Sequence, residues 1–373
     1  MIHPARQHDF HTLAAMIAEA VESGLVTSAT DGDLTLHCYS RSAVYDRLWT
    51  PAALMCRGLI LDYSEKRVVS SPWPKFFNYL EGEQTIPNLG FETFEKVDGS
   101  LIQIFWDRGI WRAATKGSFR SDQAKWAADV LAATDLSCLV KGGTYLAEAV
   151  GPQNRIVVYY PKDELVLLGA YDEAGYEYTF DELSEIGWQL NWRVAHRHPY
   201  ASISELLVKA EKLPASEEGF VLRFANGLRL KIKGDEYKRI HALVSRITPL
   251  GIWEAMAAGD DLNKVRRDLP EEFWGDFDAI SSVLGRRVTD IEKRVAQEAA
   301  TVFHLSDKEV GLRLNQFPEN VRRFIFPWRN NGGDLLNGRT RQMLFRGLRP
   351  TGNVLPGYTP SYAMNRVMED TVG

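Results

Sequence analysis

Cysteine is scarce in this chain, and its spacing matches no metal site. The 373 residues include three cysteines, Cys38, Cys56 and Cys138, and no two of them form a Cys-x-x-Cys pair. An odd number of thiols without metal-ligand spacing indicates reduced side chains rather than a disulfide framework or a structural zinc site. We therefore expect a protein of the cytoplasm.

Long apolar runs and an excess of positive charge are also absent. The first ten residues include His, Pro, Arg, Gln and Asp, unlike a secretory signal, and no stretch approaches the roughly 20 apolar residues that span a bilayer. Lysine and arginine number 44 against 49 aspartate and glutamate residues, a formal net charge of -5. This balance argues against binding nucleic acid through a bulk positive field, so any basic groups that hold a nucleic acid must be focused in a groove.

Strand-like alternation is present from about residue 57 to residue 233. Its strongest hairpin signal is Asn226-Gly227, between two runs of apolar and β-branched residues. After Tyr237 the period changes to 3.6 residues, and almost no strand-like alternation remains. The predicted helices before that point cover residues 10–22, 121–133 and 181–188, and the longest one after it covers residues 277–300.

This pattern predicts an α+β protein whose first domain is built from antiparallel sheets. The chain is long enough for two domains. We expect the sheet domain over residues 1–240, an all-helical domain over residues 241–348, and an extended tail over residues 349–373, where Pro and Gly are dense.

One short run places a lysine beside a tight turn. Glu95-Lys96-Val97-Asp98-Gly99-Ser100 separates two strand-like segments, so we predict a β-hairpin with Lys96 at the end of its first strand. A lysine in that position can be a nucleophile, provided that its amine is neutral. An isolated match of this kind would more simply be a surface hairpin with a solvated lysine.

Further runs follow in a fixed order. They are Thr115-Lys116-Gly117-Ser118, Tyr145-Leu146-Ala147-Glu148-Ala149-Val150, Glu217-Glu218-Gly219-Phe220-Val221 and Leu230-Lys231-Ile232-Lys233, with Arg57-Gly58-Leu59-Ile60 and Lys75-Phe76-Phe77-Asn78 upstream. The ordered set resembles the motifs of covalent nucleotidyltransferases, the superfamily of ATP-dependent ligases and RNA capping enzymes. Within it, the run from Lys96 to Leu101, together with Thr115-Lys116-Gly117-Ser118, resembles RNA ligase 1 of the T-even phages rather than a DNA ligase. DNA ligases usually have an arginine shortly after the Asp-Gly pair, where this chain has Ser100 and Leu101. A segment from Glu148 to Ile156, with Asn154-Arg155 inside it, matches as well.

The resemblance implies that Lys96 takes AMP from ATP and releases pyrophosphate. That attack needs cations around the triphosphate, and the candidates are Arg57, Lys75, Lys231 and Lys233. Lys231 and Lys233 are two residues apart, so on a strand they share one face. The alternative is that this pair lies on an edge strand of a sheet, where the charge of the two lysines discourages aggregation. We expect the neighbouring cations to lower the pKa of Lys96.

The resemblance also assigns acidic and nucleotide-binding residues. Glu148 and Glu218 are the expected ligands of Mg²⁺ or Mn²⁺, which need few carboxylates when phosphate oxygens are present. Glu218 is also expected to assist catalysis, together with Lys231 and Lys233. The expected nucleotide-binding residues are Arg57, Lys75, Glu95, Lys96, Lys116, Glu148, Lys231, Lys233 and Tyr237.

The implied function is an ATP-dependent RNA ligase that joins a 5'-phosphate to a 3'-hydroxyl through lysyl-AMP and RNA-adenylate intermediates. Its expected partner is RNA, and the resemblance implies nicked tRNA as the substrate that is repaired. We expect the protein to be a monomer. We expect it in the cytoplasm, or in the cytoplasm of the host cell if a phage encodes it. The alternatives are a capping-type or DNA-joining enzyme and a non-catalytic RNA-binding module. Arg322, Arg323 and Arg329, interleaved with aromatic residues, are the candidate RNA surface of the helical segment.

Overall fold

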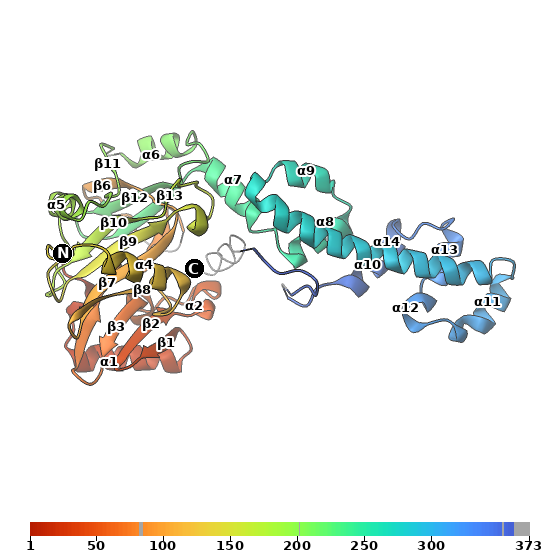
Figure 1. Ribbon diagram of the computed structural model, residues 1–373, viewed down its shortest axis with the longest axis horizontal. Coiled ribbons are helices and arrows are strands. Elements are labelled where there is room, and N and C mark those ends of the chain that lie inside the picture. Colours follow the sequence, from red (N-terminus) through yellow and green to blue (C-terminus); the bar gives the residue numbers. More distant parts are fainter. Residues whose placement is uncertain (82–84, 201, 353, 362–373) are drawn as a thin grey trace. The chain divides into compact units, whose positions relative to one another are not determined.

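The computed structural model describes residues 1–81, 85–200, 202–352 and 354–361. Within this part, residues 1–241 form one compact unit and residues 242–361 form a second (Figure 1). Every named strand ends before residue 234, and helices make up the regular structure after it. The predicted α+β fold with a helical C-terminal region is therefore confirmed. Of the expected tail, residues 362–373 lie outside the described residues.

The first unit contains three sheets. One has the order β1-β2-β3-β4, the second β10-β9-β7-β8, and the third β11-β6-β12-β13-β5. All neighbouring strands are antiparallel except β13 and β5. The strands are β1 (Val26–Asp31), β2 (Leu34–Tyr39), β3 (Arg57–Asp62), β4 (Arg67–Ser70), β5 (Phe77–Asn78), β6 (Phe91–Glu95), β7 (Ser100–Asp107), β8 (Ile110–Thr115), β9 (Thr144–Val150), β10 (Glu164–Tyr171), β11 (Arg197–His198), β12 (Gly219–Phe224) and β13 (Arg229–Lys233).

Helices cover these sheets with apolar faces. The first begins where the Asp9 carboxylate accepts a hydrogen bond from the N–H of Thr12 (3.0 Å), and it buries Leu13 and Ile17 against the first sheet. The fourth and fifth pack on the second sheet, and the sixth packs on the third. The helices of the first unit are α1 (Phe10–Glu22), α2 (Arg41–Tyr45), α3 (Pro51–Met55), α4 (Asp122–Ala132), α5 (Phe180–Leu190) and α6 (Ile203–Ala210). The next helix, α7 (Asp235–Val244), includes residues of both units.

The predicted hairpin around Asp98-Gly99 is wrong. The strand before the turn, β6, belongs to the third sheet, whereas β7 after the turn belongs to the second, so the segment from Lys96 to Gly99 crosses between sheets. Gly99 is needed there because a Cβ atom would collide with the carbonyl oxygen of Ala149 on β9. The hairpin predicted at Asn226-Gly227 is confirmed, with Gly227 at φ +76°.

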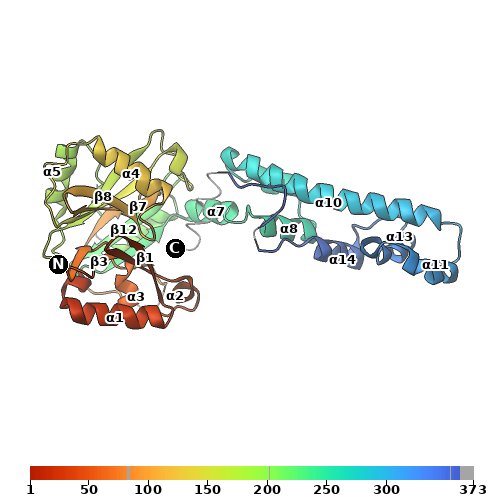
Figure 2. The same cartoon turned by 60° about the horizontal axis from the view of Figure 1, so that its bottom comes forward.

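The second unit is organised along one long helix, α10 (Figures 1 and 2). Shorter helices pack along it, and together they bury a core that includes Val295, Phe324 and Leu344. The helices of this unit are α8 (Pro249–Ala258), α9 (Leu262–Arg267), α10 (Trp274–Thr301), α11 (Asp307–Arg313), α12 (Glu319–Arg322), α13 (Ile325–Asn330) and α14 (Gly338–Leu348). No helix among the described residues has the length and apolar character of a membrane span.

Candidate active site

Lys96 is held beside a buried carboxylate. Its backbone N–H donates to the carbonyl oxygen of Gly219 (2.9 Å), which joins the segment that contains Lys96 to the start of β12. Its Nζ lies 2.5 Å from Oε2 of Glu218, and Nζ of Lys233 lies 2.9 Å from the other oxygen, Oε1. Glu218 is 3% exposed and therefore bridges two ammonium groups inside the protein. The adjacent Glu217 is exposed, which settles which of the two glutamates belongs to this cluster.

The charges around Lys96 do not act as the sequence suggested. Burial by itself disfavours its ammonium form, but the attraction of Glu218 and then of Glu148 outweighs burial and raises the pKa of Lys96. Burial likewise opposes ionisation of Glu218, and the attraction of Lys96 and Lys233 outweighs it, so the pKa of Glu218 is lowered. The predicted lowering of the pKa of Lys96 is therefore wrong for this arrangement, because its nearest charge is negative.

Lys231 has the lowered pKa instead. It lies two residues before Lys233 on β13, and both side chains line the same cavity, as the alternation predicted. Among the residues described, no carboxylate forms an ion pair with its ammonium group. Burial, followed by the repulsion of Lys96 and Lys233, lowers the pKa of Lys231 to about 7.

Asp98 fixes the turn that carries Lys96. It is 2% exposed, and its Oδ2 accepts hydrogen bonds from the N–H groups of Val157 (2.9 Å) and Val158 (2.8 Å). Its Oδ1 accepts one from the hydroxyl of Tyr237 (2.8 Å). Burial and then the repulsion of Glu218 raise the pKa of Asp98 to about 6. Tyr237 is 1% exposed and is not among the residues that line the cavity, so this arrangement does not support the nucleotide contact expected for it, and its hydroxyl positions Asp98.

A cavity of about 610 Å³ lies between the second and third sheets and opens over these groups. It brings together the other site residues that the sequence predicted: Arg57, Lys75, Glu95, Lys96, Lys116, Glu148, Glu218, Lys231 and Lys233. Glu95 donates its N–H to the carbonyl oxygen of His196 (2.7 Å), so this group is not available to a nucleotide base.

Two cations on the cavity wall have aromatic neighbours. The guanidinium of Arg57 lies 5.4 Å from the ring centre of Phe76, and its buried Nη1 has no hydrogen-bond partner among the described side chains and backbone. Nζ of Lys75 lies 5.1 Å from the ring centre of Tyr39 and 5.3 Å from that of Trp49. A buried guanidinium nitrogen with an open donor fits a polyanionic ligand such as a triphosphate.

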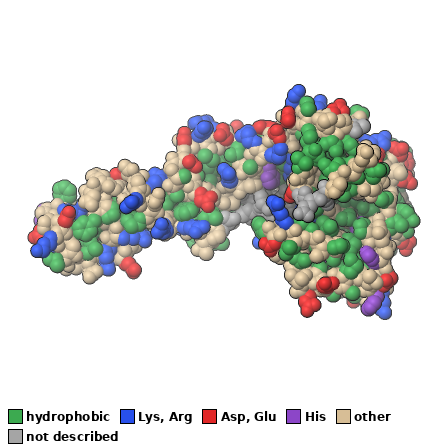
Figure 3. Space-filling view, turned by 180° about the vertical axis from the view of Figure 1, so that it is seen from behind, with side chains coloured by type: hydrophobic (Ala, Val, Ile, Leu, Met, Phe, Trp, Pro, Cys, Tyr) green, Lys and Arg blue, Asp and Glu red, His purple; other side chains and the backbone are tan. Residues whose placement is uncertain are grey.

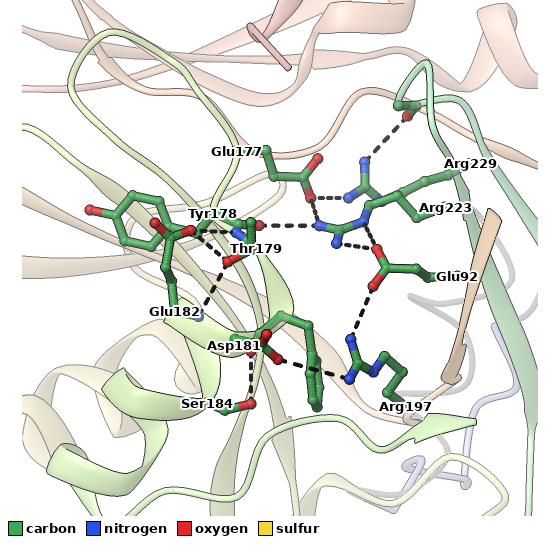
Figure 4. A network of polar contacts seen from close by, with 12 residues as sticks. Glu92, Glu177, Tyr178, Thr179, Asp181, Glu182, Ser184, Arg197, Arg223 and Arg229 are labelled. Atoms are coloured by element: carbon green, nitrogen blue, oxygen red, sulfur yellow. Dashed lines mark hydrogen bonds and ion pairs between the residues drawn. The ribbon is translucent and has the colours of Figure 1, made fainter. Parts of the chain in front are cut away.

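An ion network forms another part of the wall, and the sequence analysis missed it. Arg223 on β12 donates to Glu92 (3.1 Å) and to Glu177 (3.2 Å), and Arg229 on β13 pairs with Glu177 (Figure 4). The strand register sets Arg223 opposite both Glu92 and Arg229. These pairs tie the third sheet to the segment that leads into α5. Their balanced charges make the network a brace rather than an anion site.

The acidic groups offer limited metal coordination. Within the described chain, no group of three or more His, Cys, Asp or Glu side chains is arranged to hold a metal ion. Both oxygens of Glu218 contact lysines, whereas Glu148 lines the cavity from β9. These lysine contacts therefore argue against Glu218 as a metal ligand in this arrangement.

The basic cluster in the second unit is largely committed to its own fold. Arg329 donates to the carbonyl oxygens of Val302 (2.9 Å) and Leu305 (2.8 Å), and Arg322 donates to that of Phe317 (3.2 Å). Only Arg323 of the three is exposed. The RNA surface expected from these arginines is therefore unsupported for two of them, because their donors close helix ends.

Part of this chain is similar to known proteins. Residues 55–237 match a protein family described as RNA ligase. A putative bifunctional polynucleotide kinase/RNA ligase of Autographa californica nuclear polyhedrosis virus is 27% identical over 314 residues, which are 75% of this chain and 42% of that protein. A putative RNA ligase of Thermovibrio ammonificans is 27% identical over 209 residues, 52% of this chain and 54% of that protein. The chain thus spans about half the length of the curated relatives it matches.

Among solved structures, this chain is similar to an archaeal ATP-dependent RNA ligase, and the aligned part covers 96% of this chain and 96% of the ligase chain. It is 14% identical, with a TM-score of 0.48.

Proposed function

We propose that this chain, whose residues 55–237 match the RNA ligase family, joins RNA ends at the expense of ATP. The observation that carries the proposal is the cluster in which Lys96 meets Glu218 at 2.5 Å, with Lys231 and Lys233 on the same cavity wall. An amine with further lysine side chains beside it in a cavity suits attack on a nucleoside triphosphate.

In the first step, Nζ of Lys96 attacks the α-phosphorus of ATP. A nitrogen–phosphorus bond forms while the bond to the pyrophosphate oxygen breaks. Glu218 holds Lys96 as an ammonium group in the free protein, so the amine must first lose a proton, and Glu218 is its nearest acceptor. Lys231 and Lys233 would stabilise the charge of the departing pyrophosphate. Between the charged groups, Phe94 and Val221 provide apolar wall for adenine.

A divalent metal, Mg²⁺ or Mn²⁺, would be held by phosphate oxygens and Glu148, and when bound it would neutralise part of the triphosphate charge. In the second step the AMP passes from Lys96 to the 5'-phosphate of an RNA strand. In the third a 3'-hydroxyl attacks that phosphate and AMP leaves. Nicked tRNA is our proposed natural substrate. The described residues after β13 contain helices and turns without a strand, which argues against a capping-type or DNA-joining enzyme with a second, strand-built domain.

Incubation with radiolabelled ATP and a divalent metal tests the proposal. An enzyme of this kind becomes covalently labelled and then seals a 5'-phosphorylated oligoribonucleotide. A non-catalytic RNA-binding module would bind the RNA without acquiring label, and this result would reject the proposal.

Lys231→Met and Lys233→Met should change stability in opposite directions. Lys231 is half-buried and forms no ion pair with a carboxylate in the described chain, so its loss should raise the Tm by roughly 3 °C at neutral pH. Loss of Lys233 leaves Glu218 with one partner and should lower the Tm. Because the folded-state pKa of Lys231 is lowered to about 7 from 10.5, the cost of its charge is fully present below pH 7 and disappears as the pH rises toward 10.5. Thermal unfolding at pH 6.5 and pH 10 measures both effects.

The same two variants test the pyrophosphate clamp. Each should slow labelling by ATP more than it slows sealing of pre-adenylated RNA, because pyrophosphate has already left in the later step. If a variant impairs both reactions equally, the lysine that it replaces does not act by stabilising the departing pyrophosphate.

We further propose that the helical unit selects the RNA. Lysine and arginine side chains are spread along it in Figure 3, and α14 presents Arg339, Gln342 and Arg346 as exposed residues at helical spacing. Arg339→Gln combined with Arg346→Gln should lower the affinity for RNA and reduce the slope of log K against log salt by about 1.4, if each arginine contacts one phosphate. Labelling by ATP is the control, since these residues lie outside the unit that contains the cavity.

A further inference from the structure

The loop between β9 and β10 is attached directly to the turn that carries Lys96. Val157 and Val158 donate their N–H groups to the Asp98 carboxylate, and the N–H of Asp98 donates to the hydroxyl of Tyr160 (3.1 Å). At the start of the loop, the side-chain amide of Asn154 donates to the carbonyl oxygen of Ala149 on β9. Loop residues 151–163 therefore have a backbone fixed on the nucleophile's segment, although they have little regular structure.

This loop exposes an aromatic ring next to a cation. Tyr159 is 58% exposed, and the guanidinium of Arg155 lies 5.3 Å from its ring centre. Nε of Arg155 donates to the carbonyl oxygen of Val157 (3.0 Å), so the guanidinium is held in place. Ile156, between them, lines the active-site cavity. The loop thus contributes to the cavity wall with one residue and carries the Arg155–Tyr159 pair immediately beside it.

We propose that the Arg155–Tyr159 pair docks the end of a single RNA strand, with a base stacked on Tyr159 and a backbone phosphate against Arg155. The inference rests on the proposed function and extends it to a residue-level RNA site. An exposed tyrosine on a fixed backbone stacks on any base, and arginine contributes charge to the phosphate. A chain with a net charge of -5 needs such a local site, because its overall field repels RNA.

The position of the pair explains how an RNA end would be presented to Lys96. Asp98 links the loop to the turn that follows Lys96, so a strand docked on Tyr159 would be held relative to the nucleophile by two hydrogen bonds to one carboxylate. Asp98, Val157 and Val158 are buried, whereas Tyr159 is not, which separates the fixed part of the loop from the part that is free to bind.

The test uses Tyr159→Ala, Tyr159→Trp and the matched control Tyr176→Ala, in the full-length protein. Tyr176 is also a largely exposed tyrosine (51%) and does not line the cavity. Each protein is labelled with ATP, freed of nucleotide and mixed with a 5'-phosphorylated oligoribonucleotide at several concentrations, and transfer of AMP is followed in a single turnover.

We expect Tyr159→Ala to accept label from ATP at the wild-type rate and to require about tenfold more RNA for half-maximal transfer. Tyr159→Trp should retain wild-type transfer because the indole also stacks, and Tyr176→Ala should be unaffected. If Tyr159→Ala needs no more RNA than the wild type for half-maximal transfer, the docking site is wrong. An equal loss of labelling and of transfer would also overturn it, because such a loss indicates a structural role for Tyr159. Absence of label in the wild-type protein would instead reject the proposed function itself.

Discussion

Lys96→Arg should form no covalent adenylate, whereas the wild-type chain becomes labelled by radioactive ATP. A guanidinium group remains charged at any pH at which the protein is folded, so it has no electron pair for attack on phosphorus. Arginine can still pair with Glu218, and the loss should therefore come from chemistry rather than from unfolding. We expect labelling to fall by at least a factor of about 1000, to the background of the assay.

The control for this variant is Lys125→Arg, an exposed lysine on α4 that pairs with Asp122 at 3.5 Å. It should be labelled normally. The label on the wild-type protein should be removed by acid, as expected for a phosphoramidate, and it should map to a peptide containing Lys96. Acid-labile label on Lys96→Arg would show that another lysine is the nucleophile.

The members of the site were predictable because they occur in short ordered runs. Alternation alone placed Lys231 and Lys233 on one face, and the β13 register agrees. The path of the chain through the turn was not predictable. Asp-Gly between two strand-like segments favours a hairpin, but the pairing of β6 with β12 and of β7 with β9 depends on partners that are distant in the sequence.

Charge effects were harder to predict than positions. The sequence analysis named four cations for the site, Arg57, Lys75, Lys231 and Lys233. Only the fold shows that the group in contact with Lys96 is the carboxylate of Glu218. Burial, followed by repulsion, therefore lowers the pKa of Lys231, whereas the pKa of Lys96 is raised. Arg229 could have been found by continuing the alternation of Lys231 and Lys233, whereas its partner Glu177 lies in a segment with no motif.

Glu218→Gln should destabilise the first unit and change the pH dependence of labelling. The substitution keeps the shape of the side chain but leaves Lys96 and Lys233 without their common carboxylate in a buried site. Removing one member of a buried ion pair costs about 3 kcal/mol or more in the free energy of unfolding. The exposed neighbour provides the matched control, and Glu217→Gln should be close to neutral.

The pH dependence of that loss follows from the shifted pKa values. The pKa of Glu218 is lowered in the folded state, so its stabilising contribution is present above its ordinary value of 4.5 and disappears as the pH falls through the lowered value. The pKa of Lys96 is raised, so its contribution is complete below 10.5 and disappears as the pH rises through the raised value. Urea unfolding should therefore show the largest difference between Glu218→Gln and the wild type from about pH 5 to pH 10.

Labelling by ATP should respond to Glu218→Gln in a second way. Without its main attractive partner, Lys96 retains the effect of burial and the repulsion of its neighbours, and its pKa should fall. The alkaline rise in the rate of labelling should therefore move to lower pH, even if the maximal rate is reduced. An unchanged pH profile together with unchanged stability would mean that the contact between Lys96 and Glu218 is not formed in solution.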